Sequence, residues 1–196
     1  MISYLKGKLV YKDPTHVIIE VNGVGYQVNI SLNTFADIKD KEDILLSTHL
    51  QVREDAHILY GFSSPQEKSM FQHLISVNGI GPGTAMMVLS YLPPGELRSA
   101  IIREDAVALQ SIKGIGGKTA QRMILELKDK LRKDSAEEIS PGATTPHNKT
   151  KAEALSALLT LGIARPAAEK SIDTVLKKSG NSLTLEELVK QALRNA

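Results

Sequence analysis

Two glycine-rich stretches of the chain have the composition of phosphate-binding turns. They read VNGIGPGTA over residues 77–85 and IKGIGGKTA over residues 112–120, and the second contains the letters GGKT. Glycines let a backbone turn tightly and approach an anion closely, and the first amides of a helix carry the positive end of its dipole. Binding of phosphate groups is therefore the chemistry that these residues indicate.

Neither stretch has the spacing of the common nucleotide-binding motifs. A P-loop needs a glycine five residues before the glycine that precedes Lys-Thr, and that position holds Ile112. The dinucleotide motif needs a third glycine three residues after the second, and those positions hold Thr84 and Thr119. We therefore exclude nucleotide sites of both types.

The two stretches are copies of one structural unit. Placing Gly79 on Gly114, an offset of 35 residues, also matches residues on both sides of these two glycines. The matched pairs are Leu74 and Leu109, Ser76 and Ser111, Ile80 and Ile115, Gly81 and Gly116, Thr84 and Thr119, Ala85 and Ala120, and Leu92 and Leu127. Each copy has an apolar helix end, a Gly-Ile-Gly turn and a second helix with an apolar face, which predicts a tandem helix-hairpin-helix.

Two such hairpins offer a way to hold double-stranded DNA. Packed about an approximate twofold axis, two phosphate sites can contact both backbones of one duplex without reading its bases. The alternative is that the glycines only make tight turns in a helical bundle. Lys113, Lys118 and Arg122 gather around the second turn and favour DNA binding, because a purely structural turn does not explain them.

Composition places few further limits on function. The 196-residue chain has no cysteine and a net charge of +2, and residues 63–133 hold ten Lys and Arg against six Asp and Glu. The chain has no apolar run of membrane-spanning length and no signal-peptide pattern, since Lys6 and Lys8 interrupt its apolar start. We therefore expect a cytoplasmic protein with no membrane partner.

No catalytic site, metal or other cofactor is expected. The five histidines are scattered, with no carboxylate at metal-ligand spacing, and no arrangement of a serine or cysteine nucleophile is evident. We therefore expect a non-catalytic DNA-binding protein. The alternatives are a catalytic DNA-repair enzyme, a glycosylase or nuclease that uses hairpins to hold duplex, and a general single-strand binder, which the 4% aromatic content disfavours.

The elements that position the hairpins predict a mixed, multi-domain fold. Residues 1–63 read as an OB-type β-barrel of five strands, at 2–11, on both sides of Asn22-Gly23 in 16–30, at 43–52 and at 57–62, with a helix near 34–38. Residues 64–133 read as the all-α tandem hairpin domain. Its first helix begins after Ser64, with Pro65 in the first turn and Glu67 completing a capping box.

The remaining residues read as a linker and a partner-binding module. Residues 134–149 are polar and contain two prolines, which predicts a flexible linker. Residues 150–196 contain three short amphipathic helices, the last opened by a capping box from Thr184 to Glu187. They predict a small three-helix bundle.

A pair of acidic residues, Glu54 and Asp55, lies between the last two predicted strands, at a hairpin tip. In a DNA-binding protein such residues form either an ordinary polar turn or a repulsive element that faces the DNA. The residues alone favour the ordinary turn.

The order of these motifs resembles the RuvA family, the Holliday-junction-binding subunits of the bacterial branch-migration complex. The resemblance rests on EVNGVGYQV, VREDAHILYGF, NGIGPGTA and IKGIGGKTA, and on the three-helix tail, and it covers the chain apart from the linker. It implies a homotetramer, or two tetramers forming an octamer, that holds a four-way junction open and flat. It also implies two partners in DNA recombination and repair, the hexameric ATPase RuvB and the resolvase RuvC.

The resemblance assigns roles to particular residues and reverses the preference at the acidic pair. Glu54 and Asp55 match an acidic pin at the centre of the junction. The positions implied to face DNA are Asn78, Gly79, Gly81, Gly83, Lys113, Gly114, Gly116, Gly117, Lys118, Thr119 and Arg122. The positions implied to bind the motor are Leu158, Leu161 and Leu193, each of which fits the bundle core equally well.

Two of the DNA-facing positions depart from the family pattern. Gly83 and Gly117 stand where relatives can carry lysine, and Lys113 is a nearby candidate to supply a charge. Fewer cations at the DNA imply a shallower dependence of affinity on salt.

Overall fold

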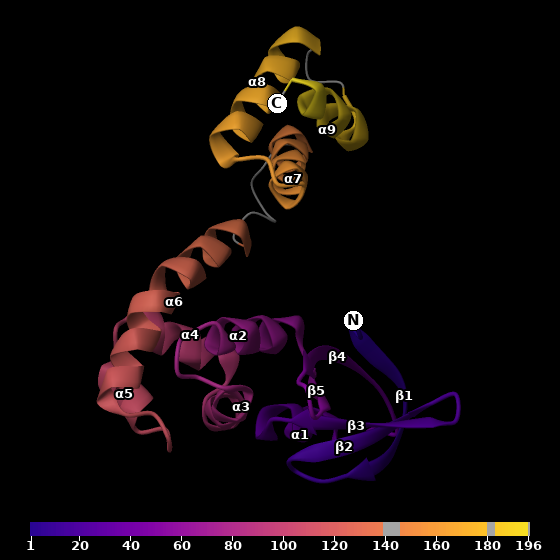
Figure 1. Ribbon diagram of the computed structural model, residues 1–196, viewed down its shortest axis with the longest axis vertical. Coiled ribbons are helices and arrows are strands. Elements are labelled where there is room, and N and C mark those ends of the chain that lie inside the picture. Colours follow the sequence, from indigo (N-terminus) through magenta and orange to yellow (C-terminus); the bar gives the residue numbers. More distant parts are fainter. Residues whose placement is uncertain (139–145, 180–182, 196) are drawn as a thin grey trace. The chain divides into compact units, whose positions relative to one another are not determined.

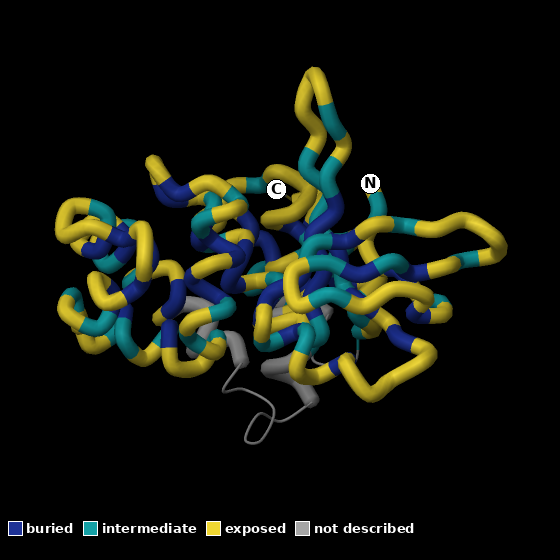
Figure 2. Tube along the Cα trace, turned by 90° about the horizontal axis from the view of Figure 1, so that it is seen from below, coloured by how far each residue is buried: buried dark blue, intermediate teal, exposed yellow. Residues whose placement is uncertain are grey.

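The computed structural model describes residues 1–138, 146–179 and 183–195. Internal contacts divide the chain into two compact units, residues 1–134 and 135–196. The predicted barrel and hairpin domains therefore lie in one unit, and the three-helix module lies in the other. Figure 2 shows buried residues inside the fold and exposed residues along the turns and hairpin tips.

Five strands close into a barrel at the start of the first unit (Figure 1). They are β1 (Tyr4–Lys12), β2 (His16–Val21), β3 (Val24–Ile30), β4 (Asp43–Val52) and β5 (His57–Phe62), hydrogen-bonded in the order β1-β2-β3-β5-β4, and β4 pairs back with β1. Only β3 and β5 pair in parallel. The tight turn at Asn22-Gly23 has positive φ at both residues, as its sequence predicts. The OB-type barrel prediction is confirmed.

Alternation along the strands fills the barrel. In β2 the side chains of Val17 and Ile19 are fully buried, while Glu20 of the same strand is exposed to solvent. The core that these residues join is aliphatic, with Leu5, Leu9, Val28, Ile30, Ile38, Ile44, Leu46 and Leu59.

Helix α1 (Leu32–Ile38) and helix α2 (Pro65–Ile75) attach the hairpin repeat to the barrel. The predicted capping box at Ser64 is only half formed: Ser64 Oγ accepts a hydrogen bond from Glu67 N at 3.2 Å, but the Glu67 carboxylate points elsewhere. It accepts hydrogen bonds from Ser31 Oγ and, at 2.5 Å, from Thr34 Oγ1. Glu67 is only 2% exposed, so a buried carboxylate joins α1 to α2 instead of capping its own helix.

The hairpin repeat shares its core with the end of the barrel. It comprises α2, α3 (Pro82–Tyr91), α4 (Pro94–Ile102), α5 (Ala106–Gln110) and α6 (Gly117–Glu138). The rings of Phe62 on β5 and Phe71 on α2 lie 5.0 Å apart, and both side chains are fully buried. The N–H of Leu32 in α1 donates to Ser90 Oγ in α3 at 3.1 Å. Packing and hydrogen bonds therefore hold the barrel and the hairpins together.

In the part of residues 146–196 that the structure describes, the second unit contains the helices α7 (Pro146–Thr160), α8 (Arg165–Ser179) and α9 (Leu185–Arg194). They pack around a small apolar core, and both hydrogen bonds of the predicted capping box between Thr184 and Glu187 are present. The linker predicted at residues 134–149 overlaps a helix at each end, and the linker itself stays a prediction. Helix α6 continues to Glu138 and α7 begins at Pro146, while residues 139–145 lie outside the described part of the chain.

Replacing Glu67 by Gln is expected to reduce a pH dependence of the free energy of unfolding. Burial raises the pKa of Glu67 above its ordinary value of 4.5, although the hydrogen bonds from Ser31 and Thr34 favour the ionised form. The folded state then binds the proton more tightly than the unfolded chain. The contribution of Glu67 to stability is therefore full below the unfolded-state pKa and is lost as pH rises through the folded-state pKa.

Urea unfolding of both proteins at about pH 4, 6 and 8 measures this difference. The wild type should lose stability relative to Glu67→Gln as the pH rises. The exposed carboxylate variant Glu42→Gln is the matched control and should keep the wild-type profile. Parallel pH profiles for wild type and Glu67→Gln would contradict the assignment.

Candidate nucleic-acid interface

The first turn (residues 76–81) and the second turn (residues 111–116) have the same backbone hydrogen bonds. Ile80 N donates to Val77 O at 3.1 Å, and Ile115 N donates to Ile112 O at 3.0 Å. Other equivalent pairs are Ala85 N to Gly81 O and Ala120 N to Gly116 O, both 2.9 Å, and Ser76 Oγ to His73 O and Ser111 Oγ to Ala108 O, both 2.7 Å. The duplication predicted from the sequence is therefore also present in the backbone geometry of the two turns.

Each turn depends on one glycine with a positive φ. The φ angles are 90° at Gly79 and 89° at Gly114, a region that costs an L-residue about 1–2 kcal/mol. The isoleucine after each of these glycines is buried, with 4% of Ile80 and of Ile115 exposed. Burial of the isoleucine fixes the turn to the core and leaves the glycine backbone on the surface.

The start of each following helix presents bare backbone. Gly81 is the N-cap of α3 and makes no side-chain capping hydrogen bond. A Cβ atom built on Gly81, Gly83 or Gly116 would meet nothing within 4 Å, so no neighbouring atom covers these positions. At Gly117 the atoms nearest to a Cβ belong to the Gln110 side chain, the first at 3.6 Å. Such a surface can accept an anion without moving a side chain.

The two repeats contact each other reciprocally across the turns. Arg122 on α6 donates from Nη1 to Asn78 O in the first turn at 3.0 Å. A Cβ at Gly79 would lie 3.8 Å from that nitrogen, and a Cβ at Gly114 would lie 3.9 Å from Sδ of Met87. Because Met87 is the counterpart of Arg122 at the 35-residue offset, the two contacts are related by an approximate twofold axis.

Positive side chains of the second repeat gather around the two turns. Lys113 and Lys118 lie at the second turn and Arg122 reaches the first; all three are exposed, and Thr119 is half-buried. The first turn has the exposed, uncharged Asn78 in place of Lys113. The structure thus brings together the DNA-facing residues of each hairpin that the resemblance implies.

The acidic pair lies on a separate projection of the same unit. Glu54 and Asp55 are exposed at the tip between β4 and β5, and Arg53 N donates to Ala56 O at 2.8 Å to close the turn. Both carboxylates face solvent and can act on a ligand only through their charge or through direct contact.

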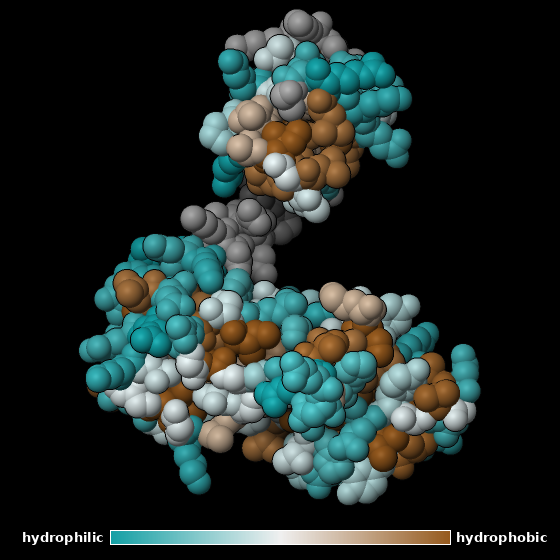
Figure 3. Space-filling view, in the orientation of Figure 1, coloured by the Kyte–Doolittle hydropathy of each residue, from teal (hydrophilic) through white to brown (hydrophobic). Residues whose placement is uncertain are grey.

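Two of the three leucines expected to bind a partner are exposed in the second unit. Leu161 is 61% exposed and Leu193 is 41% exposed, whereas Leu158 is fully buried in the bundle core. The structure therefore corrects the role of Leu158 to that of a core residue. Leu159, which sequence reasoning missed, is 39% exposed. Figure 3 shows apolar surface over α7 and α9.

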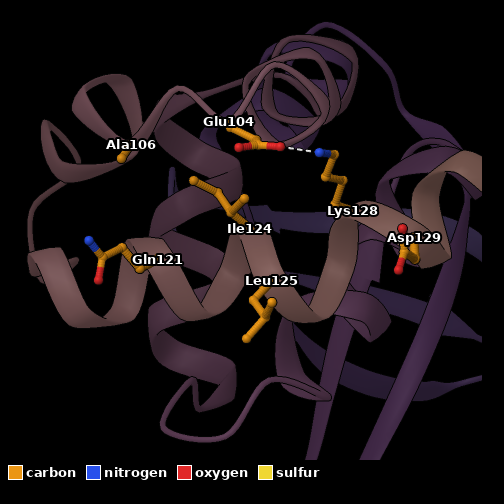
Figure 4. A pocket seen from close by; sticks show the side chains of 7 residues that line it. All are labelled: Glu104, Ala106, Gln121, Ile124, Leu125, Lys128 and Asp129. Atoms are coloured by element: carbon orange, nitrogen blue, oxygen red, sulfur yellow. Dashed lines mark hydrogen bonds and ion pairs between the residues drawn. The ribbon is translucent and has the colours of Figure 1, made fainter.

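The hollow between α5 and α6 has no catalytic arrangement (Figure 4). Glu104 and Lys128, which line this hollow, form an ion pair. The hydrogen bond from Lys128 lowers the pKa of Glu104. The exposed Leu125 lines the same hollow. Across residues 1–138, 146–179 and 183–195, no three His, Cys, Asp or Glu side chains group together as metal ligands. Among those residues, no helix has the length and apolarity needed to cross a membrane.

Three protein-family models match successive parts of the chain. The model described as RuvA N terminal domain matches residues 1–61, and the SAM-like helix-hairpin-helix tandem model matches residues 71–129. The model described as RuvA, C-terminal domain matches residues 150–196. The second match covers both turns, and the first covers the acidic pair.

Curated relatives match along the whole chain. The protein of Cytophaga hutchinsonii is 52% identical over 197 residues and that of Christiangramia forsetii is 50% identical over 194 residues, each alignment covering 99% of both chains. The protein of Flavobacterium psychrophilum is 45% identical over 195 residues, covering 100% of both chains. All three are named Holliday junction branch migration complex subunit RuvA.

Proposed function

Because the chain belongs to the RuvA family, we propose that it binds four-way DNA junctions and serves as a subunit of a branch migration complex. The observation that carries this proposal is the pair of equivalent turns, which present bare glycine backbone on the surface and contact each other about an approximate twofold axis. Two phosphate sites related in this way fit the two backbones of one duplex arm.

Contacts to phosphate make this binding independent of sequence. Main-chain amides at a helix start and exposed Lys and Arg side chains bind phosphate oxygens, which position a protein but do not identify bases. A migrating junction changes sequence at each step, so a subunit that follows it must hold DNA by its backbones.

A tetramer is the assembly that this function requires. A four-way junction has four arms, and four copies of one hairpin pair can each hold one arm in an open, planar arrangement. At the centre, Glu54 and Asp55 would repel phosphates and help to part the strands as each duplex is drawn inward. A second tetramer on the opposite face would give an octamer.

The second unit is the proposed docking site for the motor subunit RuvB. A small bundle with exposed leucines is suited to bind a protein partner, because isolated apolar side chains of this size gain free energy by leaving water. The chain itself is proposed to be non-catalytic, so that ATP-driven helicase activity belongs to the hexameric partner. The resolvase RuvC is the second proposed protein partner, and the cytoplasm is the proposed compartment.

A gel-shift comparison of four-way junction, linear duplex and single strand tests the main proposal. The junction should bind most tightly, because it alone offers four arms to a tetramer, and the binding should persist without magnesium. Equal affinity for the three DNAs would contradict the proposal. Mass measurement of the complex separates a tetramer from an octamer.

The double variant Glu54→Gln, Asp55→Asn is expected to bind the junction more tightly at low salt, by about three- to tenfold, since it removes repulsion of phosphates. The gain should shrink above about 0.1 M salt, where the screening length falls to about 10 Å. Titration of labelled junction DNA at several salt concentrations measures both effects.

The matched control for the acidic pair is Glu20→Gln, Glu42→Gln, which removes the same charge from exposed positions elsewhere on the barrel unit. It should change the affinity less than the pin variant does. Unchanged or weaker junction binding by the pin variant would count against repulsion.

Replacing Leu161 and Leu193 by Asp is expected to weaken binding to the purified hexameric ATPase by about tenfold or more, without lowering the melting temperature. Calorimetric titration and a thermal melt measure the two properties. Leu158→Ala is the contrasting variant: because Leu158 lies in the core, it should lower the free energy of unfolding by about 3 kcal/mol. Wild-type affinity for the ATPase in the double Asp variant would exclude this docking surface.

A further inference from the structure

The two hairpins differ in charge at every basic position of the second repeat. At the 35-residue offset, Lys113 corresponds to Asn78, Lys118 to Gly83, and Arg122 to Met87. The first hairpin therefore has none of these three cations in its own repeat. Yet the two turns have the same backbone geometry, so they offer a phosphate the same amides with a different number of charges.

Helix α6 of the second repeat brings cations to the first turn. Arg122 Nη1 lies 3.0 Å from Asn78 O, and Lys130 Nζ lies 3.2 Å from Ser76 Oγ. Arg122 is exposed, and a guanidinium has five N–H donors, of which the bond to Asn78 uses one. The same group that fixes the first turn can therefore also donate to an anion bound there.

The equivalent contact on the other side of the twofold axis supplies no charge to the second turn. Sδ of Met87 lies 3.9 Å from a Cβ built at Gly114. Met87 therefore lies beside Gly114 as Arg122 lies beside Gly79. Met87 is 44% exposed and carries no hydrogen-bond donor. At the second turn, the cations of its own repeat are Lys113 and Lys118.

We propose that Arg122, which belongs to the second repeat, is a DNA-positioning residue of the first hairpin. Its side chain reaches the first turn across the approximate twofold axis. This inference rests on the proposed function, because it assumes that both turns bind DNA phosphates. It assigns Lys113 and Lys118 to the second hairpin and Arg122 to the first. Each hairpin then has a cation at its phosphate, although the sequence places all three cations in one repeat.

Lysine at position 122 is expected not to replace arginine fully. A planar guanidinium can hold the Asn78 carbonyl and a phosphate oxygen at once from a fixed fork, whereas a lysine ammonium is a compact charge on a flexible chain. Arg122→Lys should therefore keep the charge but lose the fixed geometry.

The first measurement is the salt dependence of junction affinity. Arg122→Met makes position 122 identical to its counterpart, Met87, and removes one cation from the interface. The slope of log affinity against log salt should become shallower by about 0.9. Arg122→Lys should keep the wild-type slope and lose about three- to tenfold in affinity at every salt concentration.

The second measurement identifies which hairpin loses its contact. Junctions with a single methylphosphonate, an uncharged phosphate substitute, at each position along one arm are titrated with wild type and variants. Gly81→Asp and Gly116→Asp serve as references, because each places a carboxylate at one turn, at a position open to a Cβ and suited to an N-cap aspartate. Thermal melts of all variants check that they fold.

In Arg122→Met, methylphosphonate substitution should no longer lower the affinity at the same phosphates as in Gly81→Asp. In Lys118→Met, the phosphates where substitution has lost its effect should match those of Gly116→Asp. A match between Arg122→Met and Gly116→Asp, or an unchanged salt slope in Arg122→Met, would overturn the inference while leaving the proposed function intact. Wild-type affinity in both glycine variants would instead overturn the proposed function. If Arg122→Met does not fold, Arg122→Gln takes its place in the same phosphate map, because glutamine removes the charge and keeps an N–H donor for Asn78 O.

Discussion

The surface of the hairpin repeat depends on one backbone constraint, the positive φ at Gly79 and at Gly114. That angle reverses the chain within a single turn, so a buried isoleucine can follow immediately and the next helix can begin with its amides on the surface. A residue with a Cβ would strain both turns. Because the constraint occurs in both repeats, the two helix starts are equivalent, and the reciprocal contacts of Arg122 and Met87 relate them by an approximate twofold axis.

A buried carboxylate connects this repeat to the barrel. Glu67 accepts hydrogen bonds from two hydroxyl groups at the start of α1, and the ring of Phe62 on β5 packs against that of Phe71 on α2. Removing one partner of such a network leaves polar groups unpaired in the core, which makes the connection specific. The acidic tip at Glu54 and Asp55 therefore belongs to the same compact unit as the two glycine turns.

Charge is distributed less evenly than backbone geometry. Duplication produced two equal turns, but the cations of the second repeat have uncharged counterparts in the first. The contact between Arg122 and Asn78 O compensates for this inequality, since it brings a guanidinium of one repeat to the turn of the other. A scaffold with equal amides and shared cations can hold two DNA backbones without having the same side chains at both sites.

The sequence by itself determined the local features: the glycine turns, their duplication, the alternating strands of the barrel and the capping box at Thr184. Each depends on residues close together in the chain, where backbone preferences and periodicity act directly. Tertiary structure decided the rest. The Glu67 carboxylate does not complete its predicted capping box but accepts hydrogen bonds from hydroxyls more than thirty residues away. Leu158 is buried in the core, whereas Leu159 is exposed. Arg122 donates to the carbonyl of a residue 44 positions earlier, in the other turn. These outcomes depend on which helix faces pack together, and a local pattern does not contain that information.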